Sequence, residues 1–214
     1  MKIRTIPVGP FQENTYLVVD DDSNVAALVD PGDEAERLLE AVRESGAKLA
    51  AIWLTHAHVD HVGAIAGIKR VLDIPVYLHP LDLPLYQSAS RHGLVFGLIV
   101  DDPPPPDRIL SDGDVLELGS LRFTVMHAPG HAPGHVVIHG HGVAFVGDCL
   151  FAGSIGRTDL PLADGAALAR TLETLCTLPD AMVIYPGHGP ASTIGRERAD
   201  NPFLNGGARI LGSV

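Results

Sequence analysis

The sequence predicts an α/β (α+β) fold in which two sheets are covered by outer helices. Apolar strand-like runs recur through both halves of the 214-residue chain, and each half also shows helical periodicity. The order is strands, helix and strands, then strands, helix and a strand. Two sheets with helices on their outer faces fit this order better than one parallel sheet does. We therefore expect a single domain over residues 1–214.

The first half of the chain is expected to supply a series of short strands. Its apolar runs are bounded by turn signals such as Gly9-Pro10 and a run of aspartates at 20–22. The run that contains Trp53 is uninterrupted by polar side chains, as in a buried strand. The strands are expected at residues 3–8, 14–19, 25–29, 49–54 and 75–78.

Two helices are expected between those strands. The first follows a turn at residues 30–33, is capped by Asp33 and ends at Gly46, with apolar residues at helical spacing in between. The second is expected over residues 62–72, where the apolar residues share one face. Residues 80–100 have a mixed pattern that is helical in part.

A proline-rich run at residues 101–106 is interpreted as a surface loop, and the second half of the chain after it again contains many strand-like apolar runs. The segment 139–142 alternates histidine and glycine between two apolar runs and predicts an exposed hairpin tip. A helix is expected at residues 165–175, and strands are expected at 115–118, 121–126, 136–138, 143–146 and 181–185.

The composition limits the classes of partner. A formal net charge of −11 disfavours nucleic acid, because phosphate binding needs a basic face. No apolar stretch approaches the roughly 20 residues of a membrane span, and the N-terminus has no leader pattern. We expect a cytoplasmic protein with no membrane partner, in which Cys149 and Cys176 are buried and reduced. The oligomeric state stays open.

The most informative segment is Thr-His-Ala-His-Val-Asp-His at residues 55–61, directly after a predicted buried strand. His56 and His58 are two residues apart, so they point the same way in an extended chain. Asp60 and His61 are adjacent and diverge, so this loop can supply ligands to two metal ions. The alternative is a polar loop with histidines by accident, which the spacing disfavours.

Three further strand ends carry a histidine or an aspartate among small residues. His131 lies in a rigid Pro-Gly turn, Asp148 follows a strand within Gly-Asp-Cys, and His188 lies between two glycines. Taken singly, His131 could be a turn histidine and Asp148 a capping residue. Four strand ends of this kind together favour a metal site. His127 and His135 are expected only to support it.

These motifs, in this order, resemble those of the metallo-β-lactamase superfamily. The resemblance implies a four-layer αββα sandwich of two mixed sheets, with metals held by loops at one edge. It implies that the first metal is bound by His56, His58 and His131. The second would be bound by Asp60, His61 and His188, with Asp148 bridging. Imidazole and carboxylate ligands suit two divalent ions such as Zn²⁺, and also iron or manganese.

Shorter segments resemble a narrower branch. Gly-Asp-Cys-Leu-Phe at 147–151, Gly-Arg-Thr-Asp at 156–159 and Asn-Pro-Phe-Leu at 201–204 resemble small bacterial glyoxalase II-like hydrolases. The Gly-Arg-Thr-Asp segment is also similar to that of persulfide dioxygenases, which use one iron on the same fold. The residues that match their iron ligands are His56, His131 and Asp148.

The resulting hypothesis is hydrolysis of a small-molecule thioester, such as the glutathione conjugate S-lactoylglutathione, by metal-bound hydroxide. Asp60 would orient the hydroxide and accept its proton. A thiol with a pKa near about 8.5 leaves as thiolate without a strong general acid. Arg157 would hold the substrate's carboxylates, or it is a structural arginine paired with Asp159. An iron-dependent persulfide dioxygenase is the alternative, whereas a nuclease or a non-catalytic binding protein is disfavoured.

Overall fold

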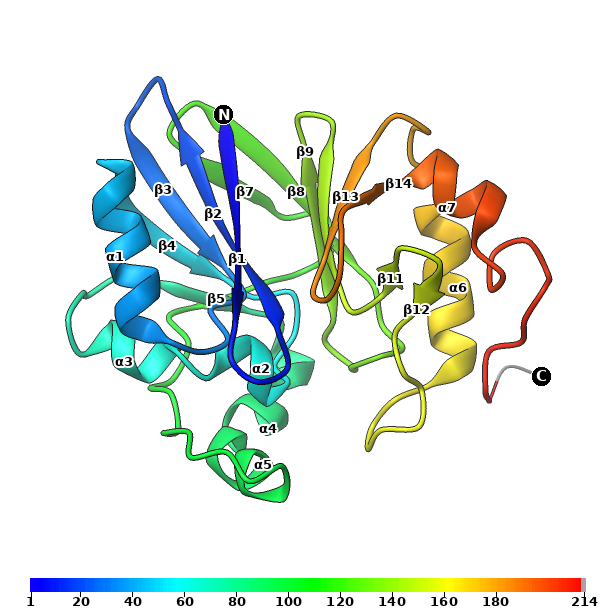
Figure 1. Cartoon of the computed structure of the whole chain (residues 1–214), viewed down its shortest axis with the longest axis horizontal. Helices are drawn as coiled ribbons and strands as arrows, with labels where there is room; N and C mark the ends of the chain where they lie inside the picture. The colour runs from blue at the N-terminus through cyan, green and yellow to red at the C-terminus, as the bar shows by residue number, and fades with distance from the viewer. Residues whose placement is uncertain (213–214) are drawn as a thin grey trace.

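A computed structural model describes residues 1–212 and shows two mixed sheets packed face to face, with helices on both outer faces (Figure 1). The predicted α/β class and the four-layer arrangement are confirmed.

The first sheet has the strand order β1-β2-β3-β4-β5-β6. The hairpin strands at its N-terminal end pair antiparallel, and from β3 onward each neighbouring pair is parallel. The strands are β1 (Lys2–Val8), β2 (Glu13–Asp20), β3 (Val25–Val29), β4 (Lys48–Trp53), β5 (Val76–Leu78) and β6 (Arg108–Ile109).

The second sheet has the order β14-β13-β10-β9-β8-β7, and only β10 and β13 pair parallel. A small separate hairpin, β11 (Leu150–Phe151) with β12 (Ser154–Ile155), follows β10. The expected exposed hairpin tip lies between β9 and β10, where His141 has a left-handed φ of 51°. The strands are β7 (Val115–Leu118), β8 (Leu121–His127), β9 (Val136–Gly140), β10 (Val143–Gly147), β13 (Val183–Pro186) and β14 (Ser192–Thr193).

Helices α1 and α3 cover the outer face of the first sheet, and α6 and α7 cover the second (Figure 1). In the described chain no helix has the length and apolar character needed to cross a bilayer. The helices are α1 (Ala35–Ser45), α2 (Val59–Val62), α3 (Ile65–Lys69), the 3-10 helix η1 (Pro80–Asp82), α4 (Leu83–Tyr86), α5 (Ala89–Val95), α6 (Gly165–Leu175) and α7 (Ile194–Asp200).

Three apolar cores hold the layers together. One lies between the first sheet and its helices and includes Leu38 and Ile65. The central core lies between the sheets and includes Trp53 and Phe123, whose rings meet edge to face at 5.4 Å. The third packs Leu168 of α6 against the second sheet. Because apolar side chains fill the space between the layers, the polar loops lie at the edges of the sheets.

The single helix expected over 62–72 is wrong, because the structure divides this region into α2 and α3. A Cβ added to Gly63 would lie 2.4 Å from the carbonyl oxygen of Gly32, so the chain passes directly against that turn. The amide of Ala64 then donates to the carbonyl of Pro31 at 3.1 Å instead of continuing the helix. Tertiary contact therefore overrides the local periodicity.

Two smaller expectations also need correction. Asp33 does not cap α1, because the N-cap is Glu34 in a left-handed conformation, and Asp33 accepts only from the Glu34 amide at 2.6 Å. Cys176 is only partly buried, whereas Cys149 is fully buried, and both are free thiols. The short strands β6, β11, β12 and β14 and the helix α7 were not expected from the sequence.

Candidate metal centre

The chain topology brings the four predicted motifs to one edge of the sandwich. Parallel β3 and β4 end side by side, and the segment with His56 and His58 follows β4. Parallel β10 and β13 also end together, and they are followed by Asp148 and His188. His131 comes from the loop between β8 and β9. Because strand ends meet at the same edge, residues more than a hundred positions apart converge.

The first cluster, the three-histidine group, consists of His56, His58 and His131, whose ligand atoms lie within 4.8 Å of one another. His58 Nδ1 and His131 Nε2 are 2.9 Å apart. His131 Nδ1 donates to the carbonyl oxygen of Arg157 at 2.9 Å, so its Nε2 faces the cluster. A metal-binding histidine is commonly oriented in this way by a hydrogen bond at its other nitrogen.

The second cluster, the Asp60 group, consists of Asp60, His61 and His188, again within 4.8 Å. His188 Nε2 lies 3.3 Å from Asp60 Oδ2, and His188 Nδ1 donates to the carbonyl oxygen of Phe11 at 3.2 Å. His61 donates from Nδ1 to Asp30 at 3.1 Å. Both imidazoles thus present Nε2 to the interior of the group.

Asp148 lies between the two clusters. Its oxygens are 3.4 Å from His131 Nε2, 3.5 Å from His61 Nε2 and 3.7 Å from His188 Nε2. Asp148 therefore faces both clusters and would be shared by them if each held an ion. All the residues expected as ligands are therefore gathered at one place.

The chemistry of this site fits divalent cations. Three buried atoms at its centre lack a hydrogen-bond partner: His56 Nε2, His61 Nε2 and Asp148 Oδ1. Leaving such atoms unpaired costs about 1–3 kcal/mol each, and metal coordination satisfies them. In the described part of the chain, every ion pair of Asp30, Asp60 and Asp148 has a histidine as its partner. Several buried carboxylates without lysine or arginine need another source of positive charge.

The electrostatics of the site favour uncharged imidazoles at His56 and His58. Burial and the neighbouring imidazoles lower the pKa of His56 well below its usual value and that of His58 to about 3. Both are thus deprotonated near neutral pH, as metal binding requires. Burial alone would raise the pKa of Asp60, but the hydrogen bond with His188 and the charge of His61 outweigh it and lower that pKa. Asp60 is therefore ionised.

Asp30 supports the site, although the sequence analysis placed it only in a turn. It accepts from the Thr55 amide at 2.7 Å and the Thr55 hydroxyl at 2.6 Å, as well as from His61. Although burial opposes it, the carboxylates of Asp148 and Asp30 raise the pKa of His61. A signal in the sequence could have identified Asp30 as a site residue. It directly follows β3, which lies beside β4, the strand that precedes the histidine segment.

Glu13 is a second supporting residue that the sequence did not reveal. It is buried at the start of β2, and its Oε1 lies 3.7 Å from His61 Nδ1 without a hydrogen-bond partner. Burial raises its pKa well above the usual value. Nothing in the local sequence marks it, because its proximity to His61 arises only from the fold.

His135 has the expected supporting role. It is fully buried, accepts from the Asp148 amide at 3.1 Å and stacks on His56 with ring centroids 4.8 Å apart. Gly187 lets the His188 loop approach closely, because a Cβ there would lie 2.2 Å from Asp148 Oδ1. His127 lies beside the site and stacks on His79 at 4.4 Å.

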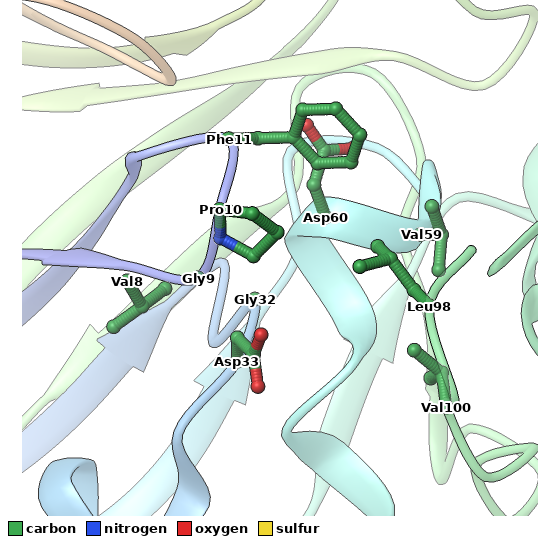
Figure 2. A pocket seen from close by; sticks show the side chains of 10 residues that line it. All are labelled: Val8, Gly9, Pro10, Phe11, Gly32, Asp33, Val59, Asp60, Leu98 and Val100. Atoms are coloured by element: carbon green, nitrogen blue, oxygen red, sulfur yellow. The ribbon is translucent and has the colours of Figure 1, made fainter. Parts of the chain in front are cut away.

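The accessible side of the site is formed by the residues that are only partly buried, His58, Asp60 and His188. Next to it is a small apolar pocket in which Phe11 and Asp60 line one side and Leu98 and Val100 another (Figure 2). The Phe11 ring also meets Phe96 edge to face at 5.5 Å.

Arg157 lies next to the site but is paired within its own loop. Its Nε and Nη2 donate to the two carboxylate oxygens of Asp159 at 2.8 and 2.9 Å, and the guanidinium is largely exposed. Its main-chain carbonyl orients His131. The side chain thus forms the structural pair that was one of the two expectations, while it remains accessible to solvent.

The fold and the site define a metallo-hydrolase of the metallo-β-lactamase fold. The sequence profile of the family described as the metallo-beta-lactamase superfamily matches residues 8–188. The chain belongs to this superfamily, as the resemblance of its motifs implied.

Comparison with individual proteins gives similar relatives over nearly the whole length. The hydroxyacylglutathione hydrolase GloC of Haemophilus influenzae is 42% identical over 210 residues, which cover 96% of this chain and 99% of the relative. The crystal structure of TTHA1623 in a di-iron-bound form is 48% identical, with a TM-score of 0.88, over 94% of this chain and all of that one. The BLEG-1 B3 metallo-beta-lactamase is 38% identical, with a TM-score of 0.86, over 95% and 99% of the two chains.

Proposed function

We propose that this protein is a metal-dependent hydrolase that cleaves a small-molecule thioester such as S-lactoylglutathione. The observation that carries the proposal is the convergence of both ligand clusters around Asp148, with Asp60 on the accessible side. The similarity to a hydroxyacylglutathione hydrolase over nearly the full chain supports the choice of thioester.

The residues that would hold the two ions are the three-histidine group, the Asp60 group and Asp148 between them. When bound, two divalent ions supply a water nucleophile at neutral pH and stabilise developing negative charge on oxygen. The existence of a di-iron-bound form of TTHA1623 supports iron as well as zinc as the native metal.

Asp60 is the group that would handle the proton. Its pKa is lowered by His188 and His61 against the effect of burial, so it is ionised and its carboxylate can accept a hydrogen bond from a water molecule. Transfer of the water's proton to this carboxylate is part of the proposal. The water oxygen forms a bond to the thioester carbonyl carbon, and the carbon–sulfur bond then breaks. The products are a carboxylic acid and a thiol, so atoms and protons balance.

The leaving group explains why a thioester suits this site. A thiolate departs without protonation because its conjugate acid has a pKa near about 8.5. We propose that Arg157, exposed beside the His131 loop, contacts the carboxylates of the glutathione moiety while it stays near Asp159. The apolar side chains of Phe11 and Leu98 in Figure 2 would contact the acyl portion.

The test combines turnover with metal analysis on the purified protein. We expect S-lactoylglutathione hydrolysis that a chelator abolishes and that added Zn²⁺ or Fe²⁺ restores. The matched control is Asp20→Asn, which replaces a buried carboxylate remote from the site and should leave turnover intact. Absence of thioester hydrolysis in fully metal-loaded protein would refute the proposal.

The second arm of the test addresses the alternative of an iron-dependent persulfide dioxygenase. That reaction would use His56, His131 and Asp148, and His131 Nε2 lies 3.4 Å from Asp148 Oδ2. Glutathione persulfide is therefore supplied in an oxygen electrode. One equivalent of bound iron, together with oxygen uptake and no thioester hydrolysis, would show that the protein is a persulfide dioxygenase and not a thioesterase.

A further inference from the structure

Asp82 is a buried carboxylate outside the predicted ligand set. It ends η1, in the region of residues 80–100 that was expected to be helical in part, and its side chain is fully excluded from solvent. Its Oδ2 accepts from the Ala57 amide at 3.1 Å, and its Oδ1 accepts from the Gly134 amide at 2.5 Å. Each oxygen of this carboxylate thus holds one main-chain N–H.

The two amides belong to the two loops that carry the three-histidine group. Ala57 lies between His56 and His58, and Gly134 lies three residues after His131. The first loop follows a strand of one sheet, and the second connects two strands of the other. Asp82 therefore ties together ligand loops from opposite sheets.

The fit around this carboxylate is tight. A Cβ added to Gly134 would lie 2.7 Å from the Asp82 amide nitrogen and 2.8 Å from its Oδ1, so the His131 loop passes directly against η1. Hydrogen bonds to an ionised acceptor are roughly twice as strong as neutral ones. An asparagine in the same place could accept at only one atom, and its NH₂ group would face the other amide.

We propose that Asp82 is a positioning residue that sets the separation of the two loops of the three-histidine group. It touches none of the ligand side chains, and it acts through the main chain on either side of them. This inference depends on the metal centre and not on the thioester chemistry, so it would survive if another substrate were found.

The test measures the affinity of each metal site by competition with a chromophoric chelator for Zn²⁺. In Asp82→Asn, we expect about tenfold weaker binding of one ion, as for other residues that orient ligands from outside the coordination sphere, and unchanged binding of the other. In a His188→Ala background the three-histidine group remains intact. There, Asp82→Asn should weaken the binding of the remaining ion by the same factor.

A matched control separates positioning from a general loss of stability. Asp20 is also a buried carboxylate that accepts main-chain N–H groups, from Ser120 at 2.8 Å and Asp22 at 3.2 Å, but it lies away from the site. Asp20→Asn should leave both affinities unchanged. Equal weakening in Asp20→Asn and Asp82→Asn, or equal loss at both sites, would overturn the proposal.

A second variant keeps the test decisive if Asp82→Asn does not fold. Gly134→Ala places a methyl group against η1, so the loop must shift relative to Asp82. We expect the same ion to bind about tenfold more weakly. Wild-type affinity for both ions in Gly134→Ala would also contradict the role assigned to Asp82.

Discussion

Replacing Asp30 with alanine is expected to destabilise the fold as well as the metal centre. This carboxylate is buried, adopts a left-handed φ of 49°, and accepts three hydrogen bonds from Thr55 and His61. The substitution leaves the Thr55 amide buried without an acceptor, whereas the Thr55 hydroxyl can turn towards His56 Nδ1 at 3.1 Å and His61 Nδ1 can turn towards Glu13 Oε1 at 3.7 Å.

The magnitude follows from two contributions. An unpaired buried N–H costs about 1–3 kcal/mol. A left-handed backbone costs an alanine about 1–2 kcal/mol more than it costs an asparagine or aspartate, which tolerate that region. Asp30→Ala should therefore lower the free energy of unfolding by about 2–5 kcal/mol, a large part of the roughly 5–15 kcal/mol of a typical domain.

Asp30→Asn is the matched control. Asparagine accepts the left-handed conformation and keeps one oxygen for the Thr55 amide, so the expected loss is only about 1 kcal/mol. Urea unfolding is measured at saturating chelator, so that metal binding does not contribute to stability. Equal losses in the two variants, or a loss below about 1 kcal/mol in Asp30→Ala, would refute the reasoning.

Three further outcomes are expected. Asp60→Asn, assayed at saturating metal because Asp60 is also an expected ligand of the second ion, should lower kcat by about 10²–10⁴-fold, and an unchanged kcat would exclude Asp60 as the proton acceptor. Arg157→Ala should raise KM for S-lactoylglutathione about two- to fivefold with kcat unchanged, as for an exposed ionic contact, and an unchanged KM would remove it from the substrate site. Asp20 accepts hydrogen bonds from Ser23 and Ser120 that hold the pKa of its carboxyl below the usual range. The stabilisation that the ionised Asp20 carboxylate gives to the folded state is therefore complete above about pH 4 and is lost as the pH falls further. The difference in unfolding free energy between wild type and Asp20→Asn should shrink on acidification, and a difference that grows would be inconsistent with this sign.

The layers and the positions of the candidate site residues could be predicted from the sequence, because both depend on local patterns. Apolar runs mark the strands, and histidine or aspartate among small residues marks their ends. His131 and Asp148 were each ambiguous alone, and the structure brings them to 3.4 Å. Four separate strand ends thus converge, because the strands that precede them in the two sheets end at the same edge of the sandwich.

The remaining features depend on contacts between distant segments. The break between α2 and α3 arises where Gly63 meets the turn at Gly32, which no periodicity reveals. Glu13 and Asp82 are supporting carboxylates whose partners lie 48 and 52 positions away, at His61 and Gly134. Only a structure shows that such residues are buried beside the site, since their own neighbours in sequence are unremarkable.

We propose that one edge of this sandwich holds two metal ions. The most direct measurement is anomalous diffraction at the zinc edge from crystals of the metal-loaded protein. We predict two peaks on either side of Asp148, one among His56, His58 and His131 and the other among Asp60, His61 and His188. A single peak, or strong peaks elsewhere with none beside Asp148, would contradict the account.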